Sequence, residues 1–168
     1  MREPLNHWTR WLALSAFVVA LDVATKAWVM RAFALGESLE VTPFFNLVLM
    51  FNRGAAFSFL ATAGGWQRWF FAAVTVVIGI GILWMLRRQH AQRLVSTALA
   101  LVLGGALGNL WDRLTLGHVI DFLQLHAAGY YWPAFNVADS AITVGVVLLV
   151  WDSLRSGARH SATARQEK

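Results

Sequence analysis

The chain has 168 residues, of which 58% are hydrophobic and 14% are charged, and its formal net charge at pH 7 is +5. This composition is too apolar for a soluble domain of this length and indicates an integral membrane protein. The sequence contains no cysteine, which excludes disulfides and thiolate chemistry.

Four apolar stretches predict membrane-spanning helices, at about residues 11–30, 66–86, 94–111 and 138–154. A helix needs roughly 20 residues to cross about 30 Å of hydrocarbon, and the first three stretches are close to that length. The fourth has a charge-free part of only 140–151, which could equally be a buried core helix. Eight of the nine tryptophans lie near the ends of the four stretches. Because tryptophan prefers the headgroup layer, this placement favours four spans.

The distribution of basic residues predicts the orientation. One side, made of the two termini and the short loop 87–93, has nine: Arg2, Arg10, Arg87, Arg88, Arg93, Arg155, Arg159, Arg165 and Lys168. The opposite side has four: Arg31, Arg53, Arg68 and Arg113. The positive-inside rule therefore places both termini in the cytoplasm. The basic residues form no continuous stripe, so nucleic acid is not the expected partner.

We expect a mainly α-helical membrane protein with one domain, residues 1–155, and a polar, disordered cytoplasmic tail, 156–168. The basic start of the chain resembles a signal peptide, but the first stretch contains Asp22 and Lys26 and three spans follow, which favours a retained helix. The segment "LEVTPFFNLVLMFN", 39–52, predicts one or two short strands broken at Pro43. A small β-sheet with unsatisfied edges must lie at or above the outer interface.

Charged residues within or at the end of a span need a partner or a function. Asp22 and Lys26 are four residues apart and can form an ion pair on one face of a helix, which makes Lys26 a poor general base. Asp112, at the end of the third span, is expected to reach the interface in a structural role. Gly104 and Gly108 share a helical face and allow close helix packing.

Two further acids lie in apolar surroundings. Asp121 has no basic residue within four positions, and Asp139 stands at the start of the fourth span, where it could serve as a helix cap. The predicted topology brings both acids to the depth of the other polar residues, near the outer interface. If their carboxyl groups meet, they share one proton, as in aspartic proteases. No metal site is expected, because the five histidines are scattered and H-E-x-x-H is absent.

Five sequence blocks resemble the lipoprotein signal peptidases (signal peptidase II), which are bacterial membrane aspartic proteases. In chain order they are "DVATK" (22–26), "NRGAAFSFL" (52–60), "GGALGNLWDR" (104–113), "GHVIDF" (117–122) and "FNVADSAI" (135–142). The blocks have the order and spacing of the family, and the resemblance covers nearly the whole chain.

The resemblance implies that Asp121 and Asp139 are the catalytic pair. It also implies residues that line or support the substrate site: Asn52, Gly54, Asn109, Arg113, Asn136, Asp22 and Lys26. The implied substrate is a diacylglyceryl-modified prolipoprotein, cut just before the lipidated cysteine at the outer face of the bacterial cytoplasmic membrane. The cyclic peptide globomycin is the implied inhibitor. We expect a monomer without a cofactor, with membrane lipid as its other partner.

Two hypotheses from other classes remain. A proton-coupled transporter or channel subunit would spread its acids through the depth of the membrane, whereas these acids cluster on one side. A scaffold protein would use the polar residues for structure alone, so that Asp121→Asn and Asp139→Asn would alter folding more than any activity.

Overall fold

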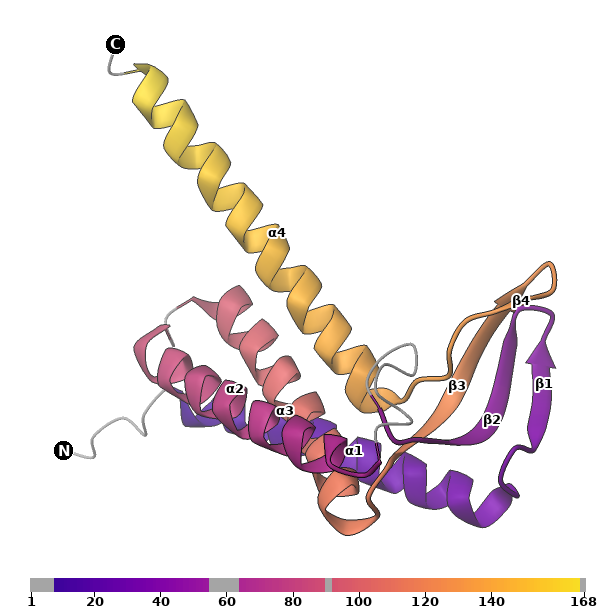
Figure 1. Ribbon diagram of the computed structural model, residues 1–168. Helices are drawn as coiled ribbons and strands as arrows, with labels where there is room; N and C mark the ends of the chain where they lie inside the picture. Colours follow the sequence, from indigo (N-terminus) through magenta and orange to yellow (C-terminus); the bar gives the residue numbers. More distant parts are fainter. Residues whose placement is uncertain (1–7, 55–63, 90–91, 167–168) are drawn as a thin grey trace.

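The computed structural model of the chain describes residues 8–54, 64–89 and 92–166. The helices are α1 (Thr9–Ala32), α2 (Gln67–Gln89), α3 (Arg93–Thr115) and α4 (Val137–Gln166). The strands are β1 (Ser38–Thr42), β2 (Phe45–Asn52), β3 (Val119–Ala127) and β4 (Tyr130–Tyr131). All strands lie in the two connections at one end of the bundle, which we call the sheet end (Figure 1).

Each of the four helices is long and apolar enough to cross a membrane. The four predicted spans are therefore confirmed, including the fourth, which the sequence left open. The tail differs from the expectation, since α4 continues to Gln166 instead of ending near residue 154. Residues 152–166 are rich in alanine, arginine and serine and contain no proline, so nothing in the local sequence stops the helix.

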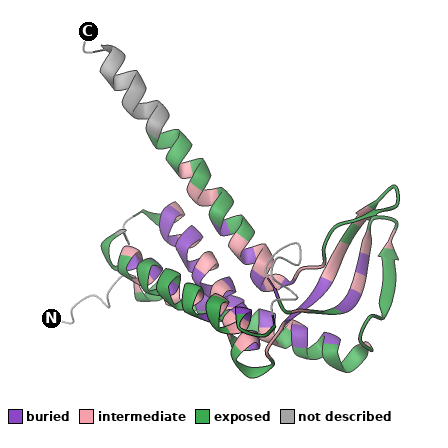
Figure 2. Ribbon diagram, viewed as in Figure 1, coloured by how far each residue is buried: buried purple, intermediate pink, exposed green. Residues whose placement is uncertain are grey.

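Helix α3 is the centre of the bundle, because α1, α2 and α4 all pack against it. Figure 2 shows that it is also the most continuously buried helix. The glycines of α3 permit α1 and α4 to approach it closely. A Cβ at Gly104 would lie 2.7 Å from Val18 Cβ, and one at Gly105 would lie 2.3 Å from the carbonyl oxygen of Ala138. The packing role predicted for Gly104 is thus confirmed, and Gly105 adds a contact to α4.

The strands form one antiparallel sheet in the order β1-β2-β3-β4. The predicted strand region 39–52 is confirmed as the β1–β2 hairpin, with Pro43 in its turn. Strand β3 was not predicted, although "VIDFLQLHA" alternates apolar and polar residues from Leu123 to Ala127. It pairs with β2 so that Asp121 stands opposite Met50.

A small core joins the sheet to the helices. Val29 of α1 packs with Leu49 of β2 and with Ile120 and Phe122 of β3, all of them buried. From this junction the sheet extends away from the bundle and diverges from α4 (Figure 1). The sequence places Asp121 in the middle of the junction, between two of the core residues.

Candidate active site

All nine residues that the sequence singled out lie near the sheet end: seven are on five different elements, and Gly54 and Asn136 are in the connections. Five of them line one open cavity of about 910 Å³ between the sheet, α3 and α4: Asn52, Asn109, Arg113, Asp121 and Asp139. The rest of its lining is largely apolar, with Met50, Phe135, Ile142 and Val144 among the contributing side chains. A largely apolar cavity with a few converging polar groups is typical of a binding site.

Asp139 stands in the first turn of α4 and is fixed there by a reciprocal cap. The Asp139 main-chain N–H donates to Oδ1 of Asn136 (2.8 Å), and the Asn136 main-chain N–H donates to Oδ2 of Asp139 (3.3 Å). Such a capping box holds both side chains and the start of the helix together. The sequence left the cap as an alternative to a chemical role, and the structure confirms the cap.

Asn136 also reaches the second acid. Its side-chain Nδ2, fully buried, donates to Oδ1 of Asp121 (2.7 Å) and lies 3.2 Å from the carbonyl oxygen of Ile120. The other carboxylate oxygen of Asp121, Oδ2, accepts from Nδ2 of Asn52 (3.1 Å) at the end of β2. The two acids are therefore brought to one place by a single asparagine, and Asn52 holds Asp121 from the other side.

Asp121 is only 3% exposed, and this burial dominates its acidity. The pKa of Asp121 is raised to about 7, chiefly by burial and next by the negative charge of Asp139, while the bonds from Asn52 and Asn136 oppose the shift. A carboxyl group with such a pKa holds its proton over much of the neutral range. Electrostatic coupling between the two acids means that they titrate as a pair.

Asn109 fixes the orientation of the other carboxylate. Its Nδ2 donates to Oδ1 of Asp139 (2.7 Å), while its own Oδ1 accepts from Nζ of Lys26 (3.1 Å) and from Nδ2 of Asn136 (3.2 Å). Because two donors face the carbonyl side, the amide cannot flip without losing both of them. The amide nitrogen of Asn109 is thus directed at Asp139.

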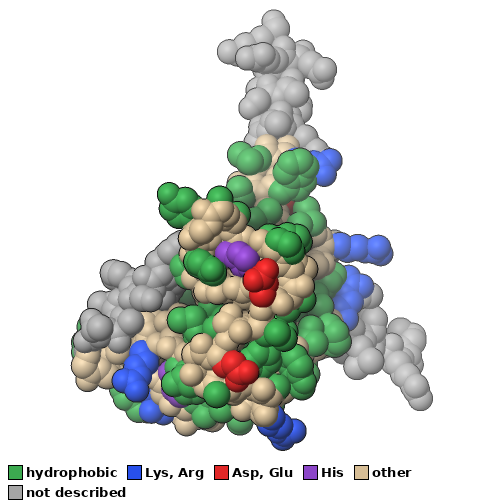
Figure 3. Space-filling view, turned by 90° about the vertical axis from the view of Figure 1, so that its right-hand side faces the viewer, with side chains coloured by type: hydrophobic (Ala, Val, Ile, Leu, Met, Phe, Trp, Pro, Cys, Tyr) green, Lys and Arg blue, Asp and Glu red, His purple; other side chains and the backbone are tan. Residues whose placement is uncertain are grey.

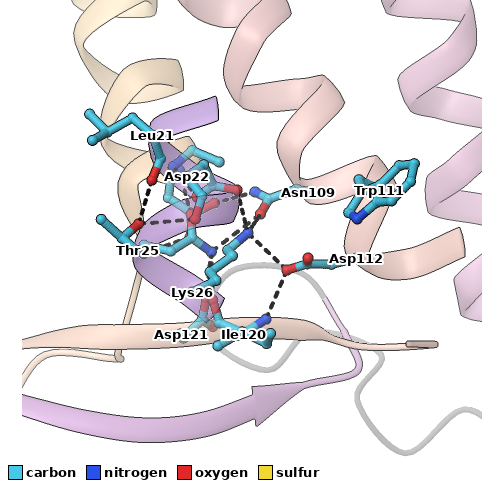
Figure 4. A network of polar contacts seen from close by, with 12 residues as sticks. Leu21, Asp22, Thr25, Lys26, Asn109, Trp111, Asp112, Ile120 and Asp121 are labelled. Carbon is cyan, nitrogen blue, oxygen red and sulfur yellow. Dashed lines mark hydrogen bonds and ion pairs between the residues drawn. The ribbon is translucent and has the colours of Figure 1, made fainter. Parts of the chain in front are cut away.

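Lys26 is the centre of a buried network behind the two acids (Figure 4). It is 2% exposed, and its ammonium group contacts Oδ2 of Asp22 (2.7 Å) and Oδ2 of Asp112 (2.8 Å) as well as Asn109. The predicted Asp22–Lys26 pair is confirmed. The expectation that Asp112 reaches the interface is wrong: Asp112 is 3% exposed, because Lys26 neutralises it and the Ile120 main-chain N–H donates to it (3.1 Å).

The network connects to the chain segments that carry the acids. Oδ1 of Asp22 accepts from the main-chain N–H of Ala138, next to Asp139 (2.9 Å). Asp112 binds the main chain of Ile120, next to Asp121. Asp22 therefore holds the main chain next to Asp139, and Asp112 holds the main chain next to Asp121. Sequence analysis missed this role of Asp112, whose signal was a third acid within the polar blocks.

Arg113 lies between the cavity and the segment that follows β2. Its Nη2 donates to the carbonyl oxygen of Gly54 (3.1 Å) and its Nη1 to that of Asn109 (3.3 Å), and its guanidinium lies 5.2 Å from the centre of the Phe71 ring. Its charge acts on both Asp139 and Asp121. The two acids, which lack basic neighbours in the sequence, therefore have two in space, Arg113 and Lys26.

Residues 55–60 of the "NRGAAFSFL" block lie outside the described residues. Within the described residues, no group of three or more histidine, aspartate or glutamate side chains is arranged to hold a metal ion.

The sequence matches the family described as signal peptidase (SPase) II over residues 14–155. The chain belongs to the signal peptidase II family. It is 58% identical over 145 residues to a lipoprotein signal peptidase of Ralstonia nicotianae, covering 86% of this chain and 84% of that protein. It is 57% identical over 150 residues to the lipoprotein signal peptidase of Cupriavidus necator, and the match covers 89% of this chain and 86% of that protein.

Solved structures agree with this membership. One bacterial membrane enzyme, determined by the in meso method, superposes with a TM-score of 0.81 at 32% identity and covers 90% of this chain and 91% of its own. A second bacterial membrane enzyme structure, determined by the same method, gives a TM-score of 0.76 at 33% identity. The superposition covers 87% of this chain and 93% of that one. A family of membrane peptidases accounts for both the four spans and the polar cavity.

Proposed function

We propose that this chain is an aspartic endopeptidase that removes the signal peptide from diacylglyceryl-modified prolipoproteins by cutting just before the lipidated cysteine. The observation that carries the proposal is the single asparagine, Asn136, that binds both Asp121 and Asp139 at one wall of the cavity. Family membership supports the substrate class, and the geometry supports the chemistry.

The environments of the two acids suggest how they divide the work. Asp121 is the buried acid with a pKa of about 7, and we assign it the shared proton. Asp139 is less buried and accepts N–H donors at both oxygens, from Asn109 and from the main chain of Asn136. Asp121 also accepts N–H donors at both oxygens, from Asn136 and Asn52, so the difference in burial decides between the two acids. We assign Asp139, the less buried acid, the role of general base.

In the first step, the Asp139 carboxylate takes a proton from water and the hydroxyl oxygen attacks the scissile carbonyl carbon. The proton of Asp121 passes to the carbonyl oxygen, giving a neutral tetrahedral diol. In the second step, Asp139 donates its proton to the cysteine nitrogen, the C–N bond breaks, and one diol proton returns to Asp121. Each acid ends as it began, so the cycle needs no metal and no covalent intermediate.

Arg113 and Asn52 support this chemistry from the cavity side. Asn52 donates to Asp121 and also accepts from the main-chain N–H of Gly54 (2.9 Å), while Arg113 donates to the Gly54 carbonyl. The turn at Gly54 is thereby tied to both the acid and the arginine. We propose that this turn and the neighbouring strand edge receive the extended segment of the substrate around the cleavage site.

The divergence of α4 from the sheet suggests the entry route (Figure 1). The cavity between them is lined by apolar side chains of α4, including Ile142 and Val144. A lipidated signal peptide can approach sideways through this opening while its acyl chains and apolar helix stay in hydrocarbon. Globomycin-type cyclic peptides are proposed to occupy the same cavity.

The proposed location is the bacterial cytoplasmic membrane, with both termini in the cytoplasm and the sheet end at the periplasmic face. The excess of basic residues at the opposite end supports this orientation. We propose that the monomer suffices for activity, because all the residues assigned here come from one chain.

The test is cleavage of a purified diacylglyceryl prolipoprotein, followed as mass loss of the signal peptide. Wild type is expected to cleave, while Asp121→Asn and Asp139→Asn lose on the order of 10³-fold or more in rate. Asp152→Asn makes the same change near the other end of the same span and should cleave like wild type. Failure of wild type to cleave, or full activity in Asp139→Asn, would refute the proposal and favour the scaffold or transporter hypotheses.

A further inference from the structure

Two arginines at the sheet end have no part in the mechanism above. Arg53 follows β2 directly, and Arg68 stands in the first turn of α2. Both meet the turn between α3 and β3. The register of β2 and β3 pairs Asn52 with Val119, which brings Arg53 beside His118. A Cβ at Gly117 would lie 3.5 Å from Nη1 of Arg68.

Neither arginine has a counter-ion in the described part of the chain, where the ion pairs are those of Lys26 with Asp22 and Asp112. Nη2 of Arg68 donates to the carbonyl oxygen of Leu114 (2.7 Å), but its Nε is buried without a hydrogen-bond partner. The nearby acid Asp112 is already bound by Lys26 and by the main chain of Ile120. The two guanidinium groups therefore form an uncompensated positive site.

His118, which lies beside Arg53 and follows Gly117, adds little charge at neutral pH. Burial lowers the pKa of His118 below its ordinary value, with Arg53 lowering it further and Asp112 opposing. In Figure 3, which looks onto the sheet end, Lys/Arg side chains and a small area of His adjoin at the lower left, whereas the larger His area lies beside an acidic side chain. The charge of this site thus comes from the two arginines.

The depth of the site follows from its tryptophans. Trp66 and Trp69 are 55% and 62% exposed at the start of α2, and the guanidinium of Arg68 lies 5.0 Å from the centre of the Trp69 ring. Exposed tryptophans at the end of a spanning helix mark the headgroup layer of the bilayer. Arg68 therefore lies at the depth of lipid phosphates.

We propose that Arg53 and Arg68 together bind the phosphodiester group of a phospholipid from the leaflet at the sheet end. A guanidinium group matches phosphate oxygens with two parallel N–H donors, and two such groups on separate elements form a clamp. Binding would fasten the end of β2 to the bilayer surface. Because Asn52 precedes Arg53 and donates to Asp121, the lipid would steady one support of the candidate catalytic pair.

The experiment uses the full chain in a phosphate-free maltoside detergent. Thermal unfolding is followed while dioctanoyl phosphatidylglycerol is added, with dioctanoylglycerol and inorganic phosphate as separate arms. Wild type should be stabilised by the phospholipid and not by dioctanoylglycerol, which has the same chains. Inorganic phosphate should bind at least tenfold more weakly, because it lacks the chains that place the headgroup at this depth.

Three variants identify the site. Arg53→Gln with Arg68→Gln should weaken the apparent affinity at least tenfold, whereas Arg53→Lys with Arg68→Lys should keep most of it, since lysine still offers a charge to phosphate. The matched control is Arg88→Gln, because Arg88 lies 4.4 Å from the centre of the Trp84 ring at the opposite end of α2. It should bind like wild type.

If the double glutamine variant is too unstable to measure, Arg53→Gln alone decides, because this exposed side chain makes no recorded hydrogen bond within the described residues and should be tolerated. Unchanged affinity in the glutamine variants overturns the proposal, as does equal stabilisation by dioctanoylglycerol or an equal loss in Arg88→Gln. Equal binding of inorganic phosphate would indicate a general anion site instead. Cleavage assays are not involved, so the outcome is independent of the proposed peptidase activity.

Discussion

Asn136 and Asp139 hold each other through two reciprocal hydrogen bonds, and the same asparagine side chain binds Asp121. A helix cap and a candidate catalytic group are thus one structural unit. The main-chain bond orients the Asp139 carboxylate, and the side-chain bond sets the position of Asp121 relative to it. The start of α4 therefore determines the geometry of the pair.

This relationship predicts that Asn136→Ser and Asn136→Ala will separate the two functions of Asn136. Serine is a good N-cap but is too short to replace the bond to Asp121, whereas alanine can do neither. Both variants should lose most of the cleavage rate. The alanine variant should in addition be less stable than the serine variant by about 1 kcal/mol. Parallel rate and thermal unfolding measurements test this, and an active serine variant would show that the bridge to Asp121 is dispensable.

Asp121→Asn should stabilise the protein at high pH while it abolishes cleavage. The folded-state pKa of Asp121 is about 7, against an ordinary value of 3.8. Between these values the folded state binds more protons than the unfolded state, so the stability contributed by this group falls as pH rises through 7. Each unit of difference between the two pKa values corresponds to about 1.4 kcal/mol of stability. Asparagine cannot ionise, so the variant avoids the cost of a buried negative charge at high pH.

Unfolding should therefore be compared at pH 5 and pH 8 in detergent. The advantage of Asp121→Asn over wild type should be larger at pH 8. Glu40→Gln, which removes an exposed carboxylate of β1, controls for the loss of one negative charge. An advantage that is equal at both pH values would mean that Asp121 is not the group responsible.

The spans and the charged residues within them could be predicted from the sequence, because lipid requires long apolar helices and makes every charge within them conspicuous. The asparagines and Gly54 were implied only by the family resemblance. The contacts between these residues could not. The sequence pairs Lys26 with Asp22 one turn away, but the bonds to Asp112 and Asn109 need α3 to pack against α1, which depends on the glycines of α3. Strand β3 could not be predicted with the same ease, because apolar and polar residues alternate only in its second half, from Leu123 to Ala127, while the first half is buried throughout.

Lys26→Met should be strongly destabilising. The ammonium group is shared by Asp22, Asp112 and Asn109, so its removal leaves two buried carboxylates without a cation. Removing one member of a buried ion pair typically costs about 3–5 kcal/mol. Thermal unfolding in detergent measures the loss.

Adding Asp112→Asn to Lys26→Met should recover part of the stability, because one unpaired charge disappears. Arg31→Met, at the exposed end of α1, is the control and should change little. A Lys26→Met protein as stable as wild type would contradict the ion-pair role.

His118 should titrate below the ordinary histidine pKa of 6.5, chiefly because it is partly buried. The unfolded chain then binds more protons than the folded chain as the pH falls below 6.5, so acidification weakens the stability contributed by His118. Arg53→Gln removes a positive charge and should raise the His118 pKa. The His118 pKa in wild type and in Arg53→Gln is measured from the imidazole resonances by NMR, with His118→Gln to assign the signal. A lower His118 pKa in Arg53→Gln would contradict the predicted proximity of the two residues.

Gly108→Ala should disrupt the site through packing alone. A Cβ at Gly108 would lie 2.6 Å from Oδ2 of Asp22 and 3.4 Å from Cβ of Ala138. The methyl group must push the Asp22 carboxylate away from Lys26 and from the main-chain N–H of Ala138, so the start of α4 and Asp139 should move.

Gly81→Ala is the matched control, because nothing lies within 4 Å of its Cβ position. Alanine there should be neutral or stabilising by up to about 1 kcal/mol, since it favours the helix. Cleavage rate and thermal stability should both fall in Gly108→Ala, and both should remain at wild-type level or above in Gly81→Ala. Equal behaviour of the two variants would show that Asp22 has room to adjust and does not position Asp139.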